Sequence, residues 1–425
     1  MELNRLSACE LAARLQSRSV DAEEVARAHL ERIAVREPAI GAWAHLDPEQ
    51  LLHAARVLDA GPIRGPLHGL PVAVKDIIAT ADMPTQYGSP VYAGHRPAWD
   101  AACVALIRAA GGLICGKTVT TEFASSHPGR TVNPLNPAHT PGGSSSGSAA
   151  SVADFMVPAA LGTQTGGSLI RPASYCGIVG YKPSFGMINR HGVKPLSESL
   201  DTVGVMARTV RDAALLASAA AGRPALREFP AGRVERVGIW RTHEWGQAEP
   251  ETVVLLEAAV RIFSVAGARI TEAVMPALFA QADRAHHDIE YYEMARALAF
   301  EMQSHRAALS DALRGRLDQG QAVDPVLYDA KQAVAEDCRR SLDDVFRDHD
   351  ILLGAATTGE APKGHAATGS AAFNRSWTLM HVPCITVPAG TGPNGLPVGI
   401  QIIARRGGDA RALAAAEWME GILGG

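Results

Sequence analysis

The stretch Leu70-Pro71-Val72-Ala73-Val74-Lys75-Asp76 indicates the fold of this chain more directly than any other part of it. Five apolar residues in a row, ended by a charged pair, are typical of a strand buried on both faces of a sheet. Similar strand patterns recur at 113–115, 237–240, 384–387 and 398–404, and helical patterns lie between them. Strands that alternate with helices predict an α/β fold, in which a large sheet lies between layers of helices.

The helices have recognisable start signals. Four expected N-cap residues share a side chain that accepts a backbone hydrogen bond: Ser7, Asp21, Asp100 and Asp409. A glutamate follows the first two after three residues, which is the spacing of a capping box. We therefore expect helices near the N-terminus, a helix from Asp100 to Ala110, and a helix that closes the chain.

The chain has no internal repeat and no convincing linker, so a single domain over residues 1–425 is expected. Within this domain, helices are expected over about 1–60 and a catalytic core over about 65–215. Residues 281–347 are mainly polar and helical in pattern, and we expect them to lie on the substrate side.

Composition narrows the function classes. The 425 residues are 47% hydrophobic and 20% charged, with a formal net charge of -4, which does not favour nucleic acid as a partner. No apolar run is long enough to span a bilayer, so no membrane partner is expected. The cysteines are scattered without close pairs, which predicts neither disulfides nor a zinc site and suits a reducing cytoplasm: Cys9, Cys103, Cys115, Cys176, Cys338 and Cys384.

Two short motifs match familiar patterns but lack the context that these patterns need. The run 111–118 fits a phosphate-binding loop, yet a helix precedes it and β-branched residues follow it. The run 143–147 fits a nucleophile elbow, yet the proline-rich segment before it cannot form a central strand. We interpret the first as a strand and the second as an accidental match.

Two glycine-rich segments carry candidate nucleophiles: Pro141-Gly142-Gly143-Ser144-Ser145-Ser146-Gly147-Ser148 and Gly162-Thr163-Gln164-Thr165-Gly166-Gly167-Ser168. Serine needs a base, and lysine is an established alternative to histidine. Lys75 suits this role because burial in an apolar strand favours the neutral amine. The glycines before Ser168 allow backbone N–H groups to converge on a developing oxyanion.

With these motifs the chain resembles the amidase signature family nearly from end to end. Further matching segments are 69–76, 171–183, 199–204, 208–212 and 395–401. The resemblance implies a single α/β domain with a large mixed sheet between helical layers, and hydrolysis of a carboxylic amide without a cofactor or metal. It implies that Ser168 is the nucleophile, Ser144 a serine after a cis peptide bond, and Lys75 the base. The amides of Thr165, Gly166, Gly167 and Ser168 would form the oxyanion hole.

The chain also departs from the common family pattern. Gln164 stands where many members carry aspartate, and Arg171 follows the nucleophile by three residues instead of two. The spacing in Ser168-Leu169-Ile170-Arg171 is similar to the malonamidase-type subgroup, whose substrates are small amides with a carboxylate. Arg171 is therefore a candidate substrate-binding residue; the alternative is that it pairs with a protein acid and braces the loop.

Several alternatives stay open at this point. The main expectation is a small-molecule amidase, alone or as a homodimer, and a carbamate or ester hydrolase uses the same site. An amidotransferase A-type subunit would act with partner subunits on misacylated tRNA, and a non-catalytic binding protein would keep only the scaffold. The cluster formed by His286, His287, Asp288 and Glu290 is not expected to bind metal, because a helix places ligands at i and i+4 and not side by side as most of this cluster stands.

Overall fold

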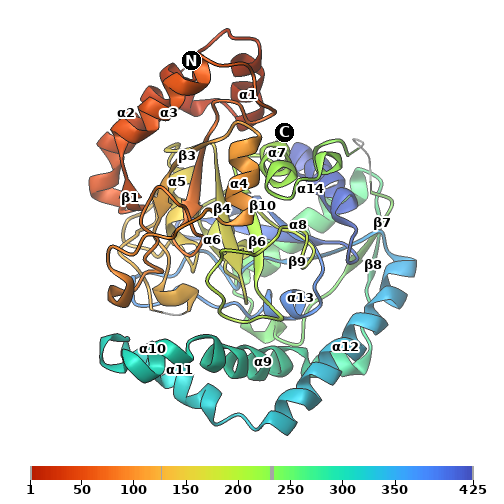
Figure 1. Cartoon of the computed structure of the whole chain (residues 1–425). Coiled ribbons are helices and arrows are strands. Elements are labelled where there is room, and N and C mark those ends of the chain that lie inside the picture. The colour runs from red at the N-terminus through yellow and green to blue at the C-terminus, as the bar shows by residue number, and fades with distance from the viewer. Residues whose placement is uncertain (1, 126, 230–233, 424–425) are drawn as a thin grey trace.

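A mixed sheet of eleven strands runs through the computed structural model, which describes residues 2–125, 127–229 and 234–423 (Figure 1). The strand order is β1-β3-β2-β4-β6-β5-β10-β11-β9-β7-β8. The strands are β1 Trp43–Leu46, β2 Pro71–Lys75, β3 Leu113–Thr118, β4 Ala159–Gln164, β5 Val179–Lys182, β6 Thr202–Ala207, β7 Arg236–Ile239, β8 Arg269–Glu272, β9 Ile351–Ala355, β10 Cys384–Thr391 and β11 Pro397–Ile403.

The strand that carries Lys75 lies inside the sheet, as its apolar run predicts. All five residues of β2 are buried, and β2 pairs in parallel with β3 on one side and with β4 on the other. Antiparallel pairs follow from β4 through β6, β5, β10 and β11 to β9, so the sheet is mixed. The side chain at the end of β2 is consequently surrounded by protein on every side.

Helices cover the sheet, which confirms the predicted α/β class. The α-helices of the described residues are α1 Ala8–Gln16, α2 Ala22–Ile40, α3 Pro48–Asp59, α4 Ala102–Ala109, α5 Ser146–Ala153, α6 Ile170–Tyr175, α7 Val210–Ala220, α8 Pro250–Val265, α9 Ala282–Ala297, α10 Ala299–Ser304, α11 Asp311–Gln321, α12 Pro325–Asp348, α13 Arg375–Leu379 and α14 Asp409–Leu423. In one group α7 contacts α1, α4 and α14, while α5 and α6 contact each other and the central strands. None of the described helices is both long and apolar enough to cross a bilayer.

The helix starts agree with the sequence in part. Ser7 and Glu10 form the expected capping box, with the Glu10 amide 3.1 Å from Ser7 Oγ. Asp100 does not cap α4, because the helix starts later and Ala101 is its N-cap residue. The Asp100 carboxylate instead accepts a bond from the Ala81 amide and pairs with Arg108.

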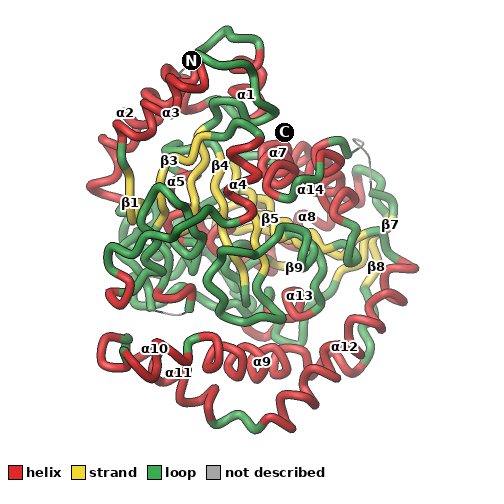
Figure 2. Tube along the Cα trace, in the orientation of Figure 1, coloured by secondary structure: helices red, strands yellow, loops and turns green. Residues whose placement is uncertain are grey.

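Helices α9 to α12 form an arm that crosses one end of the molecule, while α1 to α3 lie at the other end (Figure 1). Figure 2 shows a thick layer of loops between the strands of the sheet and the arm. The arm is attached through an apolar cluster in which Met294 of α9 and Leu298, between α9 and α10, join Phe123 and Leu196. Phe123 lies in the connection between β3 and α5, which also contains Ser144, so the arm packs against the segment that carries this serine.

Candidate active site

Lys75 lies at the centre of a buried polar contact that joins two neighbouring strands and a loop. Its Nζ atom is 2.7 Å from Ser144 Oγ and 2.7 Å from Thr163 Oγ1 on β4. The pairing of β2 with β4 brings Thr163 near the end of β2, and α5 begins just after Ser144. The peptide bond between Gly143 and Ser144 is cis, as the family resemblance implies.

The environment of Lys75 favours its neutral form. The side chain is fully buried, and this desolvation lowers the pKa of Lys75 well below its ordinary value. The carboxylate of Asp201 acts in the opposite direction and Arg171 in the same direction as burial. A neutral amine has a lone pair that can accept the Ser144 proton while an N–H group donates to Thr163. This arrangement suits the predicted role of Lys75 as a base that acts through a serine.

Ser168 lies in the loop between β4 and α6, and its side chain is 8% exposed. Within the described part of the chain, the backbone N–H groups of residues 165–168 have no hydrogen-bond acceptor. Unpaired amides beside a candidate nucleophile are what an oxyanion hole requires. The structure thus places Thr165, Gly166 and Gly167 beside Ser168 in a form that suits their predicted role.

Gln164 shapes this loop in place of the aspartate of many relatives. Its Oε1 accepts bonds from the amides of Leu169 and Ile170, at 2.9 and 3.1 Å, and so caps the start of α6. Its Nε2 donates to Thr378 Oγ1, whose hydroxyl donates in turn to the carbonyl of Gly166 at 2.8 Å. The side-chain amide of glutamine has both a donor and an acceptor, so Gln164 can cap α6 and also bind Thr378.

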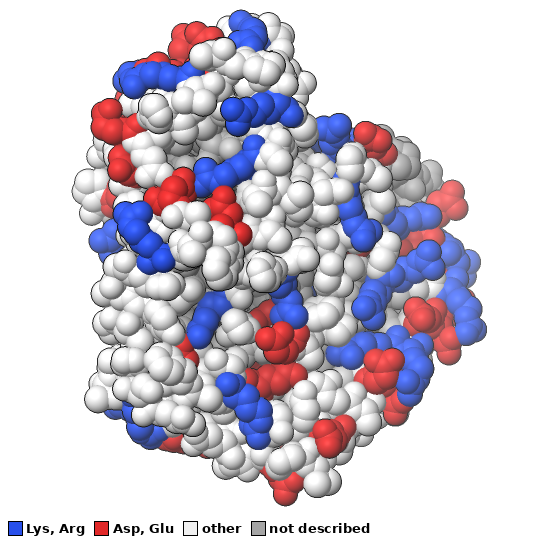
Figure 3. Space-filling model, viewed as in Figure 1, with Lys and Arg blue, Asp and Glu red and all other residues white. Residues whose placement is uncertain are grey.

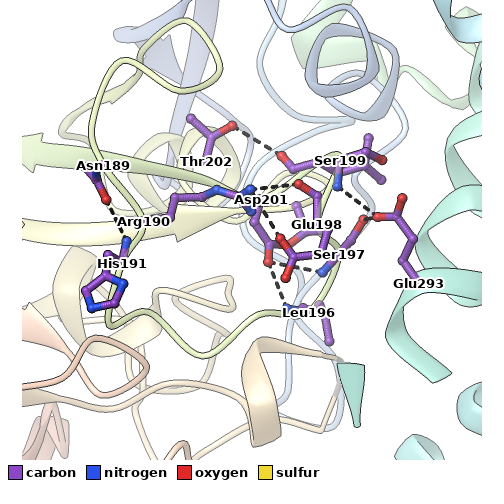
Figure 4. A network of polar contacts seen from close by, with 12 residues as sticks. Asn189, Arg190, His191, Leu196, Ser197, Glu198, Ser199, Asp201, Thr202 and Glu293 are labelled. Carbon is purple, nitrogen blue, oxygen red and sulfur yellow. Dashed lines mark hydrogen bonds and ion pairs between the residues drawn. The ribbon is translucent and has the colours of Figure 1, made fainter. Parts of the chain in front are cut away.

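Asp201 supports the same loop from the strand side. Its carboxylate accepts a 2.5 Å bond from Thr165 Oγ1 and bonds from the amides of Leu196 and Ser197. Glu293 of α9 accepts from Ser197 Oγ, so the arm is tied into this network (Figure 4). Burial raises the pKa of Asp201 to about 6. Neither Asp201 nor Glu293 was a candidate from the sequence alone, because no local motif marks either residue as part of this loop.

Arg171 is buried and braces the loops around the serines. Its Nη2 donates to the carbonyl of Gly143 at 2.6 Å and to Thr368 Oγ1, and its Nη1 donates to the carbonyl of Gly369. Among the described residues no carboxylate pairs with it, so the ion pair with a protein acid, the alternative raised from the sequence, is not observed. Its Nε has no partner among the described residues. Arg171 is therefore held by two backbone carbonyls and a threonine hydroxyl, while its Nε is buried.

A cavity of about 350 Å³ opens next to Ser168. The charged side chains in its wall are Arg171, Arg316 of α11, Arg375 of α13 and Glu290 of α9. Burial, with Arg375 and Arg316 nearby, lowers the pKa of Arg171 to about 10. Glu290 lies 3.7 Å from Arg316, and Asp283 pairs with Arg375 at 2.8 Å. Arg171 is thus the cation of this wall that lacks an acidic partner within the described residues.

The first misleading motif forms a strand, as interpreted from the sequence, and the residues just before the second, 140–142, lie in a loop. Residues 113–118 form β3, and Lys117 is buried with its Nζ bonded to Ile78 O and Thr85 Oγ1 and 3.4 Å from Asp76. A lysine engaged in this way does not face a phosphate.

No cluster of three or more potential metal ligands occurs among the described residues. The exposed face in Figure 3 shows basic and acidic side chains interspersed over large neutral areas.

Comparison with known proteins identifies the family of the chain. The Amidase family model matches residues 24–413. The chain is 49% identical over 231 residues to the A-type subunit of glutamyl-tRNA(Gln) amidotransferase from Acidothermus cellulolyticus, covering 52% of this chain and 46% of that protein. The protein of the same name from Anaeromyxobacter sp. (strain K) is 34% identical over 478 aligned positions, covering 100% of this chain and 97% of that one. The native peptide amidase of Stenotrophomonas maltophilia has a TM-score of 0.84 and 29% identity, covering 99% of this chain and 97% of that one.

The names of the two relatives conflict with the expectation that nucleic acid is not a partner, because both are named for a reaction on tRNA. The net charge of a chain does not decide whether its complex acts on tRNA, since a catalytic subunit need not itself bind the nucleic acid. None of these three proteins is named as a malonamidase, so the subgroup stays a prediction. With a family model that spans most of its length and relatives that match throughout, the chain belongs to the amidase signature family.

Proposed function

We propose that this chain hydrolyses the C–N bond of a carboxylic amide through an acyl-enzyme on Ser168. The observation that carries the proposal is the fully buried Lys75 amine 2.7 Å from Ser144 Oγ. Lys75 accepts the Ser144 proton while Ser144 accepts the proton of Ser168, whose oxygen attacks the carbonyl. The amides of Thr165, Gly166 and Gly167 hold the oxyanion.

The second half of the reaction follows from the same groups. The proton held by Lys75 returns through Ser144 to the leaving nitrogen as the C–N bond breaks, so ammonia or an amine departs. Water then attacks the Ser168 ester, gives its proton to the relay, and releases the carboxylic acid with the free serine.

The proposed substrate is a small amide that carries a carboxylate. The cavity of about 350 Å³ suits a compact ligand, and Arg171 offers it a guanidinium without an acidic protein partner. A planar guanidinium holds a carboxylate through charge-assisted hydrogen bonds. A carbamate or ester of similar shape would react by the same acyl transfer, so the substrate panel below includes both.

A second candidate is an amidotransferase A-type subunit, which the names of the curated relatives favour. The two candidates share the acyl-enzyme and differ in the fate of the nitrogen, which an amidotransferase passes to an acceptor. The alignment with the Anaeromyxobacter protein spans 478 positions, more than the 425 residues here, so that relative has segments that this chain lacks. Missing segments are places where partner contacts can be lost, which favours a stand-alone enzyme.

The deciding experiment is a hydrolysis panel of small acid-amides, neutral amides, anilides, carbamates and esters, with glutamine among the acid-amides. Ser168→Ala is the matched variant, and it is expected to stay folded and to lose nearly all turnover. If the native protein hydrolyses an acid-amide in the absence of partner subunits, the result supports the first candidate. Turnover that appears only when partner subunits co-purify supports the second candidate. Light scattering of the protein alone tests the expected homodimer. A Ser168→Ala variant with full activity contradicts both candidates.

A further inference from the structure

His286 of α9 reaches from the arm onto the loop that carries the nucleophile. Its Nε2 atom is 2.7 Å from the carbonyl oxygen of Thr165, a residue 121 positions earlier in the chain. The ring is fully buried, so water does not compete for this contact. Sequence reasoning discussed His286 only as an unlikely metal ligand. The structure instead places it behind the predicted oxyanion hole.

The direction of this hydrogen bond follows from its acceptor. A carbonyl oxygen has no proton, so Nε2 carries the hydrogen and donates it. Burial lowers the pKa of His286 and so favours the neutral ring, in which Nδ1 carries no proton. Nδ1 has no hydrogen-bond partner among the described residues, and Glu290 is 3.7 Å away. The ring is therefore a fixed single donor to Thr165.

Holding the Thr165 carbonyl also sets the direction of a neighbouring donor. The carbonyl of Thr165 and the N–H group of Gly166 belong to one planar peptide unit and point in opposite directions. A bond that fixes the carbonyl on the His286 side therefore fixes the Gly166 N–H on the other side. Thr378 Oγ1 acts in the same way one peptide later, because its bond to the Gly166 carbonyl orients the N–H of Gly167.

We propose that His286 is a positioning residue of the oxyanion hole, which orients the Gly166 N–H through the Thr165 carbonyl. This inference rests on the proposed acyl-enzyme mechanism. In this proposal His286 affects catalysis without contacting the substrate. The donors of the oxyanion hole are then correctly oriented only when α9 is packed against the loop. Asp201 supports the same residue through the Thr165 side chain, so Thr165 is held at two points.

A purely structural role for His286 predicts a different outcome. If the ring only docks α9, its loss lowers stability and weakens the binding of substrate and transition state alike. If the ring orients an oxyanion donor, its loss mainly affects states that carry the oxyanion. The second case lowers kcat with little change in KM, provided that substrate dissociation is fast.

The test uses His286→Phe, which keeps the ring and removes the donor, with His286→Gln as a variant that returns an N–H. His287→Phe is the matched control, because His287 is the next residue of α9, is partly exposed, and its printed contacts are with Tyr291 and Asp288 of the same helix. kcat and KM are measured on the best amide of the panel. Binding is measured for a trifluoromethyl ketone, which forms an oxyanion on serine, and for the matching alcohol, which does not.

His286→Phe is expected to lower kcat and ketone affinity by about tenfold to a hundredfold, with KM and alcohol affinity within threefold. His286→Gln should recover part of the loss, and His287→Phe should behave as the native protein. Equal losses for ketone and alcohol, or unchanged ketone affinity in a folded His286→Phe, would overturn the inference. Labelling of native Ser168 by a small alkyl fluorophosphonate checks the proposed function separately, since it does not depend on how the His286 variants behave.

Discussion

Removing the Thr163 hydroxyl perturbs Lys75, the proposed base of the relay, without touching the proposed nucleophile. Thr163→Val keeps the shape of the side chain and deletes the Oγ1 atom that accepts a 2.7 Å bond from Lys75 Nζ. The ammonium form of Lys75 donates more strongly to this oxygen than the neutral amine does. The deletion therefore destabilises the charged form more than the neutral form, and the pKa of Lys75 falls further below its already lowered value.

The size of the effect follows from the two kinds of hydrogen bond. A bond from a charged donor contributes about 1.5–3 kcal/mol and one from a neutral donor about 0.5–1.5 kcal/mol. The difference is about 1 kcal/mol, which corresponds to slightly less than one pH unit. Because the neutral amine is the active form, activity is present above the pKa of Lys75 and is lost as the pH falls through it. The acidic limb of kcat/KM is thus expected to move down by about one pH unit.

The assay is the pH dependence of kcat/KM on the best amide, fitted for native protein and for Thr163→Val. Thr118→Val is the matched control, because Thr118 lies opposite Lys75 in the β2–β3 register, and its hydroxyl contacts Ser148. We expect the control to keep the native acidic limb. An acidic limb that stays in place or moves up in Thr163→Val, with the protein folded, refutes the assignment of that limb to Lys75.

Two further predictions concern substrate preference and stability. Arg171→Ala is expected to weaken transition-state stabilisation, calculated from kcat/KM, by about 1.5–3 kcal/mol more for a carboxylate-bearing amide than for its methyl ester analogue. Equal losses for the two substrates would show that Arg171 only braces the Gly143 and Gly369 carbonyls. Trp377→Ala is expected to lower the free energy of unfolding in urea by about 3–5 kcal/mol, because this ring is buried against Trp240. Trp99→Ala, at a side chain 60% exposed, is the control and should change it by less than about 0.5 kcal/mol.

Local patterns in the sequence were sufficient for the strand that ends at Lys75, for the first capping box and for the strand at 113–118. Each of these depends on residues that lie within a few positions of one another. A run of buried apolar residues or a serine followed by glutamate at the right spacing is readable without the rest of the chain. The serine motifs are equally local, which is why Ser144 and Ser168 could be named from the sequence.

The sequence could not show the partners of these residues. Thr163 lies 88 positions from Lys75, and Gly369 lies 198 positions from Arg171. Such pairs depend on which strands are neighbours and on how loops and helices pack over them. Even Asp100 was assigned wrongly, because its carboxylate bonds with Ala81 and Arg108 instead of capping its own helix.

The sequence by itself thus determined the α/β class and the residue types of the relay, because a buried strand and a glycine-rich loop are short-range features. Only the tertiary structure decided that β4 delivers Thr163 to the lysine, that Arg171 holds carbonyls instead of an acid, and that α9 brings His286 behind the oxyanion loop. The physical reason is that burial and hydrogen-bond partners depend on packing between segments far apart in the chain, and a single sequence does not specify that packing by local rules.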